Sequence, residues 1–219
     1  MNRSPRPAYA FAAILIGLLL IAPVMSFFLN AFAFRWFYPQ LIPHEWSLQA
    51  WVRLLGSGSD VINALATSLE LGIGVTVLAL IIGLPAAKAL GQRKFRYMRL
   101  VEFVIFAPTF VPGITYALGI NVNFIRWGLA GTLWGVGLVH LVPVLPYVVL
   151  IMAGVFSNYD PAHEEQARTL GAGWRQTFWY VTLPAIFPGL VVAALLGFLV
   201  SWNQYLLTFL VGGGSVITL

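Results

Sequence analysis

The feature that most constrains this chain is a series of long apolar runs that carry almost no charge. No charged residue occurs between Arg6 and Arg35. The run over about residues 9–34 exceeds the ~20 apolar residues that a helix needs to cross a bilayer, and it is too long for the ~7–15-residue core of a signal peptide. We therefore expect a retained membrane-spanning helix here.

Four further apolar runs follow, and we expect each to cross the membrane. They cover about residues 61–90, 100–119, 133–156 and 185–211. Charged residues make up 9% of the sequence, far below the roughly 25% of soluble domains. The predicted fold is therefore all-α, a polytopic helical bundle with five spans in the membrane. Prolines inside the last three runs predict kinked helices, whose freed carbonyl groups need partners inside the bundle.

The lysines and arginines predict the orientation of the bundle. With a cytoplasmic N-terminus, nine of them fall inside and three outside, the asymmetry that sets membrane topology. The inner nine are Arg3, Arg6, Lys88, Arg93, Lys94, Arg96, Arg99, Arg168 and Arg175. The net charge of +5 thus reflects topology, and we expect no nucleic-acid partner. Residues 35–60, rich in Trp and Tyr, are expected to form an outer interfacial loop, so that residues 1–60 and 61–219 make two regions.

One polar segment, residues 158–184, interrupts this apolar pattern between the fourth and fifth runs. Asp160 can cap a helix by accepting from its first N–H groups, and Pro161 suits the first helical position. Gly171 supplies the left-handed residue that ends a helix. We therefore expect a helix that starts at Pro161 and stops before Gly171, then a tight turn and a second helical segment over 174–180. Together they form a helix-turn-helix elbow outside the bilayer.

The charges of this elbow predict a local ion pair. Glu164 and Arg168 stand one turn apart, with the acid on the N-terminal side, which is the favoured order on an exposed helix. An ordinary amphipathic loop helix would show the same local pattern.

At these residues the sequence resembles the permease subunits of bacterial ATP-binding cassette importers. Those proteins carry a cytoplasmic signature of Glu-Ala-Ala, three residues, Gly, nine residues, Ile, one residue and Leu-Pro. The signature's spacing is matched throughout at Glu165, Gln166, Ala167, Gly171, Val181, Leu183 and Pro184. Gln166 and Val181 depart from it, yet both keep its helical or apolar character.

This resemblance implies that residues 61–219 form the transmembrane domain of a type-1 importer in the bacterial inner membrane. It also implies that the elbow, with Glu164 included, is a coupling helix that docks in a cleft of a separate ATPase. The implied partners are a cytoplasmic ATPase dimer, a second permease subunit, identical or different, an extracytoplasmic solute-binding protein and membrane lipid. The family pattern ends with a sixth span, which we expect to be missing after the glycines at 212–214.

The substrate is less constrained by this resemblance. Residues 201–214 look similar to both the polyamine and the sugar branches of these permeases, and the turn over 208–214 favours the polyamine branch. An acidic pair typical of cation-binding membrane segments is missing there, which argues against a polyamine contact.

Polar residues at membrane depth are candidates for a solute path, because they are costly in lipid and should face the bundle interior or water. The candidates are Glu70, His140, Trp202, Asn203, Gln204 and Tyr205. The last four combine aromatic surface with amide donors and acceptors, which suits hydroxyl-rich or amine solutes. Alternatively, Glu70 reaches the interface or an internal hydrogen bond, and His140 is a packing histidine.

Signals for enzymatic chemistry are missing from the sequence. It has no phosphate loop, so we expect ATP to be bound and hydrolysed by a partner and this chain to need no cofactor. It has no cysteine, carboxylate pair or histidine cluster, so we expect no catalytic or metal residues. The alternatives to an importer permease are an ion-coupled secondary transporter, for which only Glu70 and His140 could carry the ion, and a membrane scaffold. A neighbouring gene with a phosphate loop would favour the importer.

Overall fold

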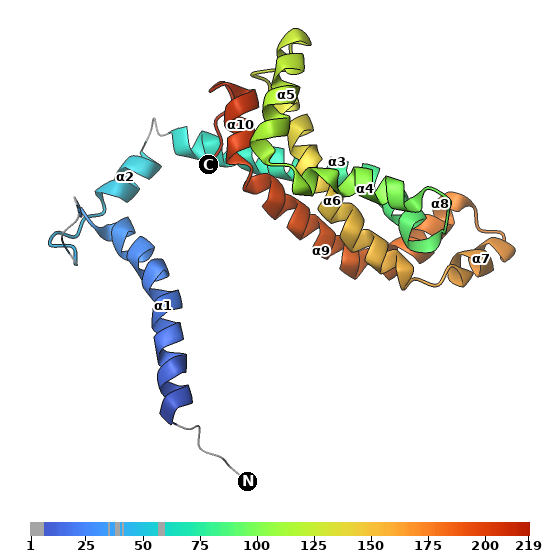
Figure 1. Ribbon diagram of the computed structural model, residues 1–219, viewed down its shortest axis with the longest axis horizontal. Helices are drawn as coiled ribbons and strands as arrows, with labels where there is room; N and C mark the ends of the chain where they lie inside the picture. The colour runs from blue at the N-terminus through green and yellow to red at the C-terminus, as the bar shows by residue number, and fades with distance from the viewer. Residues whose placement is uncertain (1–6, 35, 38–39, 41, 57–59) are drawn as a thin grey trace. The chain divides into compact units, whose positions relative to one another are not determined.

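The computed structural model describes residues 7–34, 36–37, 40, 42–56 and 60–219. Within them the helical elements are, in chain order (Figure 1), α1 (Pro7–Phe32), α2 (Gln49–Leu55), α3 (Asp60–Gln92), α4 (Met98–Phe110), α5 (Gly113–Arg126), α6 (Leu133–Ser157), α7 (Ala162–Thr169), α8 (Trp174–Thr177), the π-helical turn η1 (Phe178–Thr182), α9 (Leu183–Trp202) and α10 (Tyr205–Gly212).

The chain divides into two compact units, Met1–Ile62 and Asn63–Leu219. The predicted division after residue 60 lies close to this boundary. In the first unit, α1 is the predicted first span, and the short helix α2 meets its end through the rings of Phe32 and Trp51, whose centroids are 5.9 Å apart.

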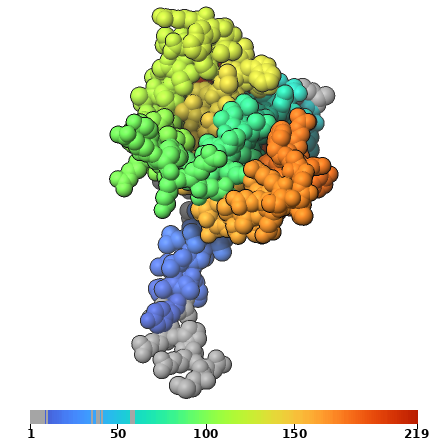
Figure 2. All heavy atoms as spheres, turned by 90° about the vertical axis from the view of Figure 1, so that its right-hand side faces the viewer, coloured from blue at the N-terminus to red at the C-terminus, as the bar shows by residue number. Residues whose placement is uncertain are grey.

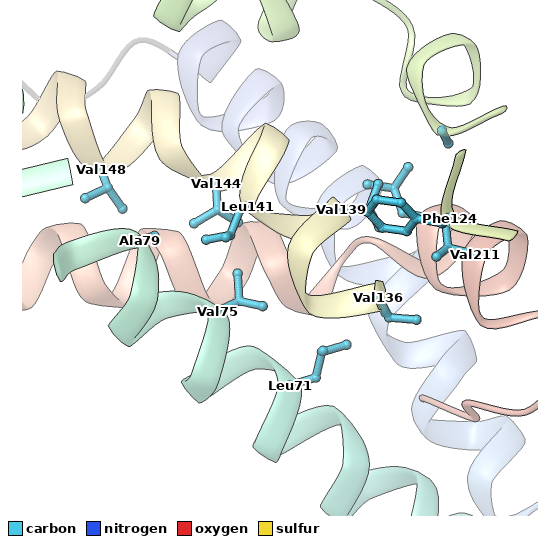
Figure 3. Packing of buried hydrophobic residues seen from close by; sticks show 12 residues of the cluster. Leu71, Val75, Ala79, Phe124, Val136, Val139, Leu141, Val144, Val148 and Val211 are labelled. Carbon is cyan, nitrogen blue, oxygen red and sulfur yellow. The ribbon is translucent and has the colours of Figure 1, made fainter. Parts of the chain in front are cut away.

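The second unit is built around α3, α6 and α9, with α6 packed along α9. Leu71, Val75 and Ala79 recur every fourth residue on α3, which places them on one face of the helix, and all three are buried. Figure 3 shows this face turned towards the buried valines of α6, with Phe124 of α5 and Val211 of α10 completing the cluster. The apolar core thus joins segments far apart in the sequence.

Four described helices are long and apolar enough to cross a membrane: α1, α3, α6 and the continuous helix Trp174–Trp202. The helices α4 and α5 are a fifth candidate only as a pair, and that pair is bent by 100°. The predicted third span, 100–119, corresponds to this bent pair, and the bend agrees with the kink that its prolines predict. The bend occurs at Val111, whose backbone is extended at φ −92° and ψ 129°. Val111 precedes Pro112, and the ring of a proline disfavours the helical conformation of the residue before it.

The predicted fifth span, 185–211, also differs from the structure. Its helix begins earlier, since α8 continues through η1 into α9, so the expected separate segment over 174–180 is part of the span. The helix then stops at Trp202, and α10 begins at Tyr205. Asn203 and Gln204 lie in the break between the two helices.

The second unit has two distinct ends. The elbow formed by α7 and α8 lies at one end, and α5 and α10 lie at the other (Figure 1). Figure 2 looks at the elbow end and shows the elbow as a continuous surface beside the end of α6. The elbow therefore lies outside the packed core of the bundle.

Candidate functional site

The first turn of α7 is fixed by the residues that precede it. The Asp160 carboxylate accepts from the backbone N–H of Ala162, two residues on, at 2.9 Å, so it forms a turn just before the helix and is not the predicted cap. The Pro161 carbonyl accepts from the N–H groups of Glu164 and Glu165 at 3.0 and 3.2 Å. Pro161 itself is the cap, so the helix begins one residue later than predicted.

The last turn of α7 closes on a glycine. Gly171 has φ +88°, which confirms the predicted left-handed residue. Its N–H donates to the Arg168 carbonyl, and the N–H of Ala172 donates to the Ala167 carbonyl, each at 3.0 Å. These two bonds make a Schellman motif, which turns the chain sharply towards α8.

One face of the elbow is open to contact with another molecule. Glu165 and Gln166 are exposed on α7, whereas Ala167 is half-buried. Large apolar side chains accompany them, since Leu170 is 89% and Trp174 71% exposed. Apolar side chains gathered beside polar ones mark protein interaction surfaces more often than isolated ones do.

The last signature residues belong to the span and not to this exposed face. Val181 lies in η1 and is half-buried. Leu183 and Pro184 form the first turn of α9, where Leu183 is half-buried and Pro184 exposed. Pro184, which has no N–H to donate, thus follows closely on the π-helical turn η1 within the continuous helix.

Glu164 departs from the prediction. It is 7% exposed, and its carboxylate accepts from Lys88 Nζ of α3 at 2.5 and 2.8 Å and from Thr182 Oγ1 of η1 at 2.8 Å. The expected partner Arg168 lies at 3.8 Å and is largely exposed. The predicted Glu164–Arg168 ion pair is thus present at 3.8 Å, but the expectation that Glu164 is exposed is wrong, because the helix turns this carboxylate towards the bundle, where Lys88 is nearer.

The charged form of Glu164 is favoured by this environment. Burial alone raises the pKa of the carboxyl group, but the hydrogen bonds from Lys88 and Thr182 and the positive charges of Lys88 and Arg168 outweigh burial and lower it. Glu164 is therefore a carboxylate held by three hydrogen bonds from two donor groups and not a free group at the surface.

At the other end of α9, Asn203 and Gln204 line a cavity of about 390 Å³. The helix break carries both amides to this wall, while α4 and α6 provide the opposite walls. The remaining lining residues are Pro108, Thr109, Pro143, Tyr147, Leu196, Leu199 and Val200. The Asn203 amide nitrogen donates to the Leu199 carbonyl at 2.7 Å, which fixes that side chain at the break. The cavity thus has an apolar wall with several neutral hydrogen-bonding groups.

The structure places the other predicted path residues elsewhere. Glu70 is exposed in a separate, mostly apolar groove of about 460 Å³ between α3 and α6. Trp202 is half-buried against the ring of Phe198, and Tyr205 is 62% exposed and stacked on Phe209.

His140 is 1% exposed and sits between two hydroxyl groups. Its Nδ1 is 3.0 Å from Ser201 Oγ, and its Nε2 is 3.0 Å from Thr208 Oγ1. Thr208 Oγ1 also donates to the Gln204 carbonyl at 3.3 Å, so it accepts from Nε2–H, and Nδ1 accepts from Ser201. The histidine therefore ties α6 to both sides of the α9–α10 break, which matches the packing alternative.

Sequence reasoning missed two polar residues of the cavity, Thr109 and Tyr147. Each follows directly on a proline, Pro108 or Pro146, inside a membrane helix. Polar residues beside helix-breaking prolines were therefore an available signal, because a kinked helix in lipid needs a packed or wet environment.

No group of three or more His, Cys, Asp or Glu side chains capable of holding a metal ion occurs among the described residues. The amides, the threonine and the tyrosine that line the cavity can donate and accept hydrogen bonds.

Comparison with known proteins relates these features to a family. The family model described as "Binding-protein-dependent transport system inner membrane component" matches residues 79–219. This match contains the elbow and every residue that lines the cavity, while Glu70 lies outside it.

Among curated proteins, the chain is 28% identical over 155 residues to the molybdenum transport system permease protein ModB of Mycobacterium tuberculosis, covering 65% of this chain and 59% of that protein. It is 27% identical over 165 residues to the spermidine/putrescine transport system permease protein PotC of Haemophilus influenzae, with 75% and 64% covered. It is also 27% identical over 196 residues to a putative 2-aminoethylphosphonate transport system permease protein PhnV of Salmonella typhi, with 88% and 73% covered. The chain thus spans about three fifths of the length of the first of these relatives.

Among solved structures, the fold is similar to a bacterial ABC transporter involved in the import of the acidic polysaccharide alginate. The TM-score is 0.75 at 22% sequence identity, and the alignment covers 96% of this chain and 76% of that one. At this identity the likeness concerns the fold alone.

Proposed function

The chain belongs to the family of binding-protein-dependent transport system inner membrane components, and from this premise we propose that it is the permease subunit of an ATP-binding cassette importer. It is a multi-pass protein of the bacterial inner membrane. In the proposed role it lines the path of a small solute and couples solute movement to ATP hydrolysis in a separate subunit.

One observation carries this proposal: the signature residues Glu165 and Gln166 lie on the exposed face of an elbow that protrudes from the bundle. A solvent-exposed carboxylate and amide beside Leu170 and Trp174 offer a mixed polar and apolar surface to a protein cleft. The occupant we propose is a cytoplasmic ATPase dimer.

The remaining partners follow from this assignment. A second permease subunit, identical or different, completes the path, and an extracytoplasmic binding protein delivers the solute. This chain needs no cofactor and performs no hydrolysis in the proposal, since the sequence has no phosphate loop and ATP is bound by the partner.

In the proposed mechanism, nucleotide binding closes the ATPase dimer and moves the elbow with its cleft. The helices of the bundle then alternate between outward and inward access around the cavity at Asn203 and Gln204. Closure favours one arrangement only through contacts that differ between the two arrangements, and the docked elbow supplies such contacts.

For the solute, the cavity favours selection by neutral hydrogen-bonding groups. Its lining has two amides, a threonine and a tyrosine, and no charged side chain. The names of the relatives refer to molybdenum at 28% identity and to spermidine and putrescine at 27%, so they do not single out polyamines. We propose that this chain passes a small polar solute that its binding protein selects. A polyamine remains one member of that class, and an ion-coupled mechanism has no carboxylate or histidine in this lining to carry the ion.

The proposal is tested by purifying the tagged chain from its native membranes. A co-purifying protein with a phosphate loop is expected. Glu165→Ala should reduce its recovery, because truncating one member of a desolvated, hydrogen-bonded charge pair costs about 2–5 kcal/mol. Glu165→Gln, which keeps an acceptor at the same length, should have a milder effect.

The matched control is Glu70→Ala, which removes an exposed carboxylate outside the elbow and outside the family match. It should leave recovery of the ATPase unchanged. Absence of any ATPase from the wild-type preparation would refute the proposed function, and equal recovery with Glu165→Ala and Glu70→Ala would remove Glu165 from the docking surface.

A further inference from the structure

We propose that Glu164 is a positioning residue, which links the elbow to two membrane spans and transmits its movement, and is not part of the surface that docks the ATPase. The inference rests on the proposed function. We call Lys88, Glu164 and Thr182 the internal joint.

The internal joint connects elements that are distant in the sequence. Lys88 belongs to α3 and lies 76 positions before Glu164, and Thr182 lies 18 positions after it. All three donor distances to the Glu164 carboxylate are 2.8 Å or less. The carboxylate side chain is 10% exposed, so water competes little for these bonds. A shift of α7 therefore pulls on α3 and on η1 together.

The π-helical turn explains why Thr182 reaches the carboxylate. In η1 the N–H of Leu183 donates to the Phe178 carbonyl, five residues earlier, which is the wider register of a π helix. This register places Thr182 with 2% exposure, directed at Glu164. Such turns interrupt α-helices often at functional sites, and here the turn is where the span meets the elbow.

The α3 side of the joint is held to α6. An added Cβ on Gly91 would lie 2.5 Å from the Ala153 carbonyl oxygen and 2.8 Å from Phe156 Cβ, so the two helices approach very closely there. The Lys88 ammonium group also lies 6.0 Å from the centre of the Phe156 ring. A displacement that reaches Lys88 is therefore shared by the ends of α3 and α6.

The Thr182 side of the joint leads to the cavity. Thr182 directly precedes α9, whose 20 residues span roughly 30 Å and end next to Asn203. The internal joint is thus at the N-terminal end of α9 and the cavity amides are at its C-terminal end. Along the backbone, α7 is connected to α9 through the glycine turn, α8 and η1.

The experiment uses the absence of cysteine from the chain. Thr109→Cys places one thiol in the cavity lining, and its rate of reaction with a water-soluble maleimide is measured in the native complex. Addition of ATP and vanadate is expected to change this rate, because the cavity changes its access. This measurement needs no knowledge of the solute.

In the Thr109→Cys background, Glu164→Gln is expected to abolish the nucleotide effect on labelling while the ATPase is recovered in full. Lys88→Met should do the same. The exchange variant, Lys88→Glu with Glu164→Lys, restores opposite charges and should recover a nucleotide effect. Rescue by exchange is a result that simple loss of a fold would not give.

Two further comparisons keep the test decisive. Arg168→Gln removes the distant cation, 3.8 Å away and largely exposed, and should leave the nucleotide effect intact. Thr182→Val, which removes the hydroxyl group, should weaken the nucleotide effect, and Thr182→Ser, which keeps it, should preserve the effect. These two variants test the joint even if the Glu164 variants fail to insert into the membrane.

The inference is overturned if Glu164→Gln retains the full nucleotide effect, or if it releases the ATPase as Glu165→Ala does. The second result would place Glu164 in the docking surface. Failure of the proposed function is distinguishable, because labelling would then be insensitive to nucleotide in the Thr109→Cys background before any joint residue is changed.

Discussion

Replacement of Gly171 should loosen the elbow through the backbone alone. Nothing lies within 4 Å of an added Cβ at this position, so no side chain obstructs Gly171→Ala. The residue has φ +88°, however, and an L-residue in a left-handed conformation costs roughly 1–2 kcal/mol. Gly171→Val should cost more, because a β-branched residue is poorly tolerated there.

The matched control is Gly173→Ala in the same turn. Gly173 has φ −70°, which any residue adopts, and the nearest atom to its added Cβ is Gln176 Oε1 at 3.8 Å, an ordinary contact. The pair of variants thus adds the same methyl group to the same turn, with strain in only one of them.

Limited trypsin digestion of the membrane-inserted protein measures the difference. Arg168 and Arg175 flank the turn, and cleavage there depends on the population in which the elbow has opened. A cost of about 1–2 kcal/mol increases that population by a factor of roughly 5–30. Gly171→Ala should therefore be cut faster by this factor and lose nucleotide-dependent transport, and Gly173→Ala should resemble the wild type. Equal cleavage of the two variants would refute the strain argument.

Three further changes test the bundle. His140→Leu leaves two buried hydroxyl groups without their imidazole partner, so thermal stability in detergent should fall by about 1–3 kcal/mol. Replacing both Asn203 and Gln204 by leucine removes the amides from the cavity, so uptake should be lost or change its solute preference while the ATPase stays bound; unchanged uptake would assign the amides to packing. Gly91→Val should force α3 from α6 at a cost of about 1–3 kcal/mol, whereas Gly74→Val, with nothing within 4 Å of its Cβ, should leave the melting temperature unchanged.

Much of the fold was predictable because it depends on composition averaged over long segments. The helices α3 and α6 begin and end within two residues of the predicted 61–90 and 133–156 runs. Hydropathy alone did not predict the bend between α4 and α5, because the mean hydropathy of an apolar run is the same whether its helix is straight or bent. The local signal was Pro112, whose effect on Val111 decided the geometry.

The turn at Gly171 and the break at Asn203 show where local sequence rules succeed and where they fail. The turn at Gly171 depends on one residue and its neighbours, so the helix-end rule placed it correctly. The break at Asn203 is different, because no proline or glycine marks it. It is stabilised by His140, which lies in another helix and bonds hydroxyl groups on both sides of the break. A hydrogen bond between residues of different helices cannot be predicted from the local sequence of one segment.

The ion-pair partner of Glu164 is likewise decided by a residue in another helix. The one-turn rule ranks only partners on the same helix, and it selected Arg168, which the structure places at 3.8 Å in a largely exposed position. Lys88 approaches both carboxylate oxygens, at 2.5 and 2.8 Å, and the site is buried. The count of cationic residues had already put Lys88 and the elbow on the same side of the membrane, so the pairing was permitted but not selected. What selects it is burial: a carboxylate removed from water needs a close cation, and an exposed one does not.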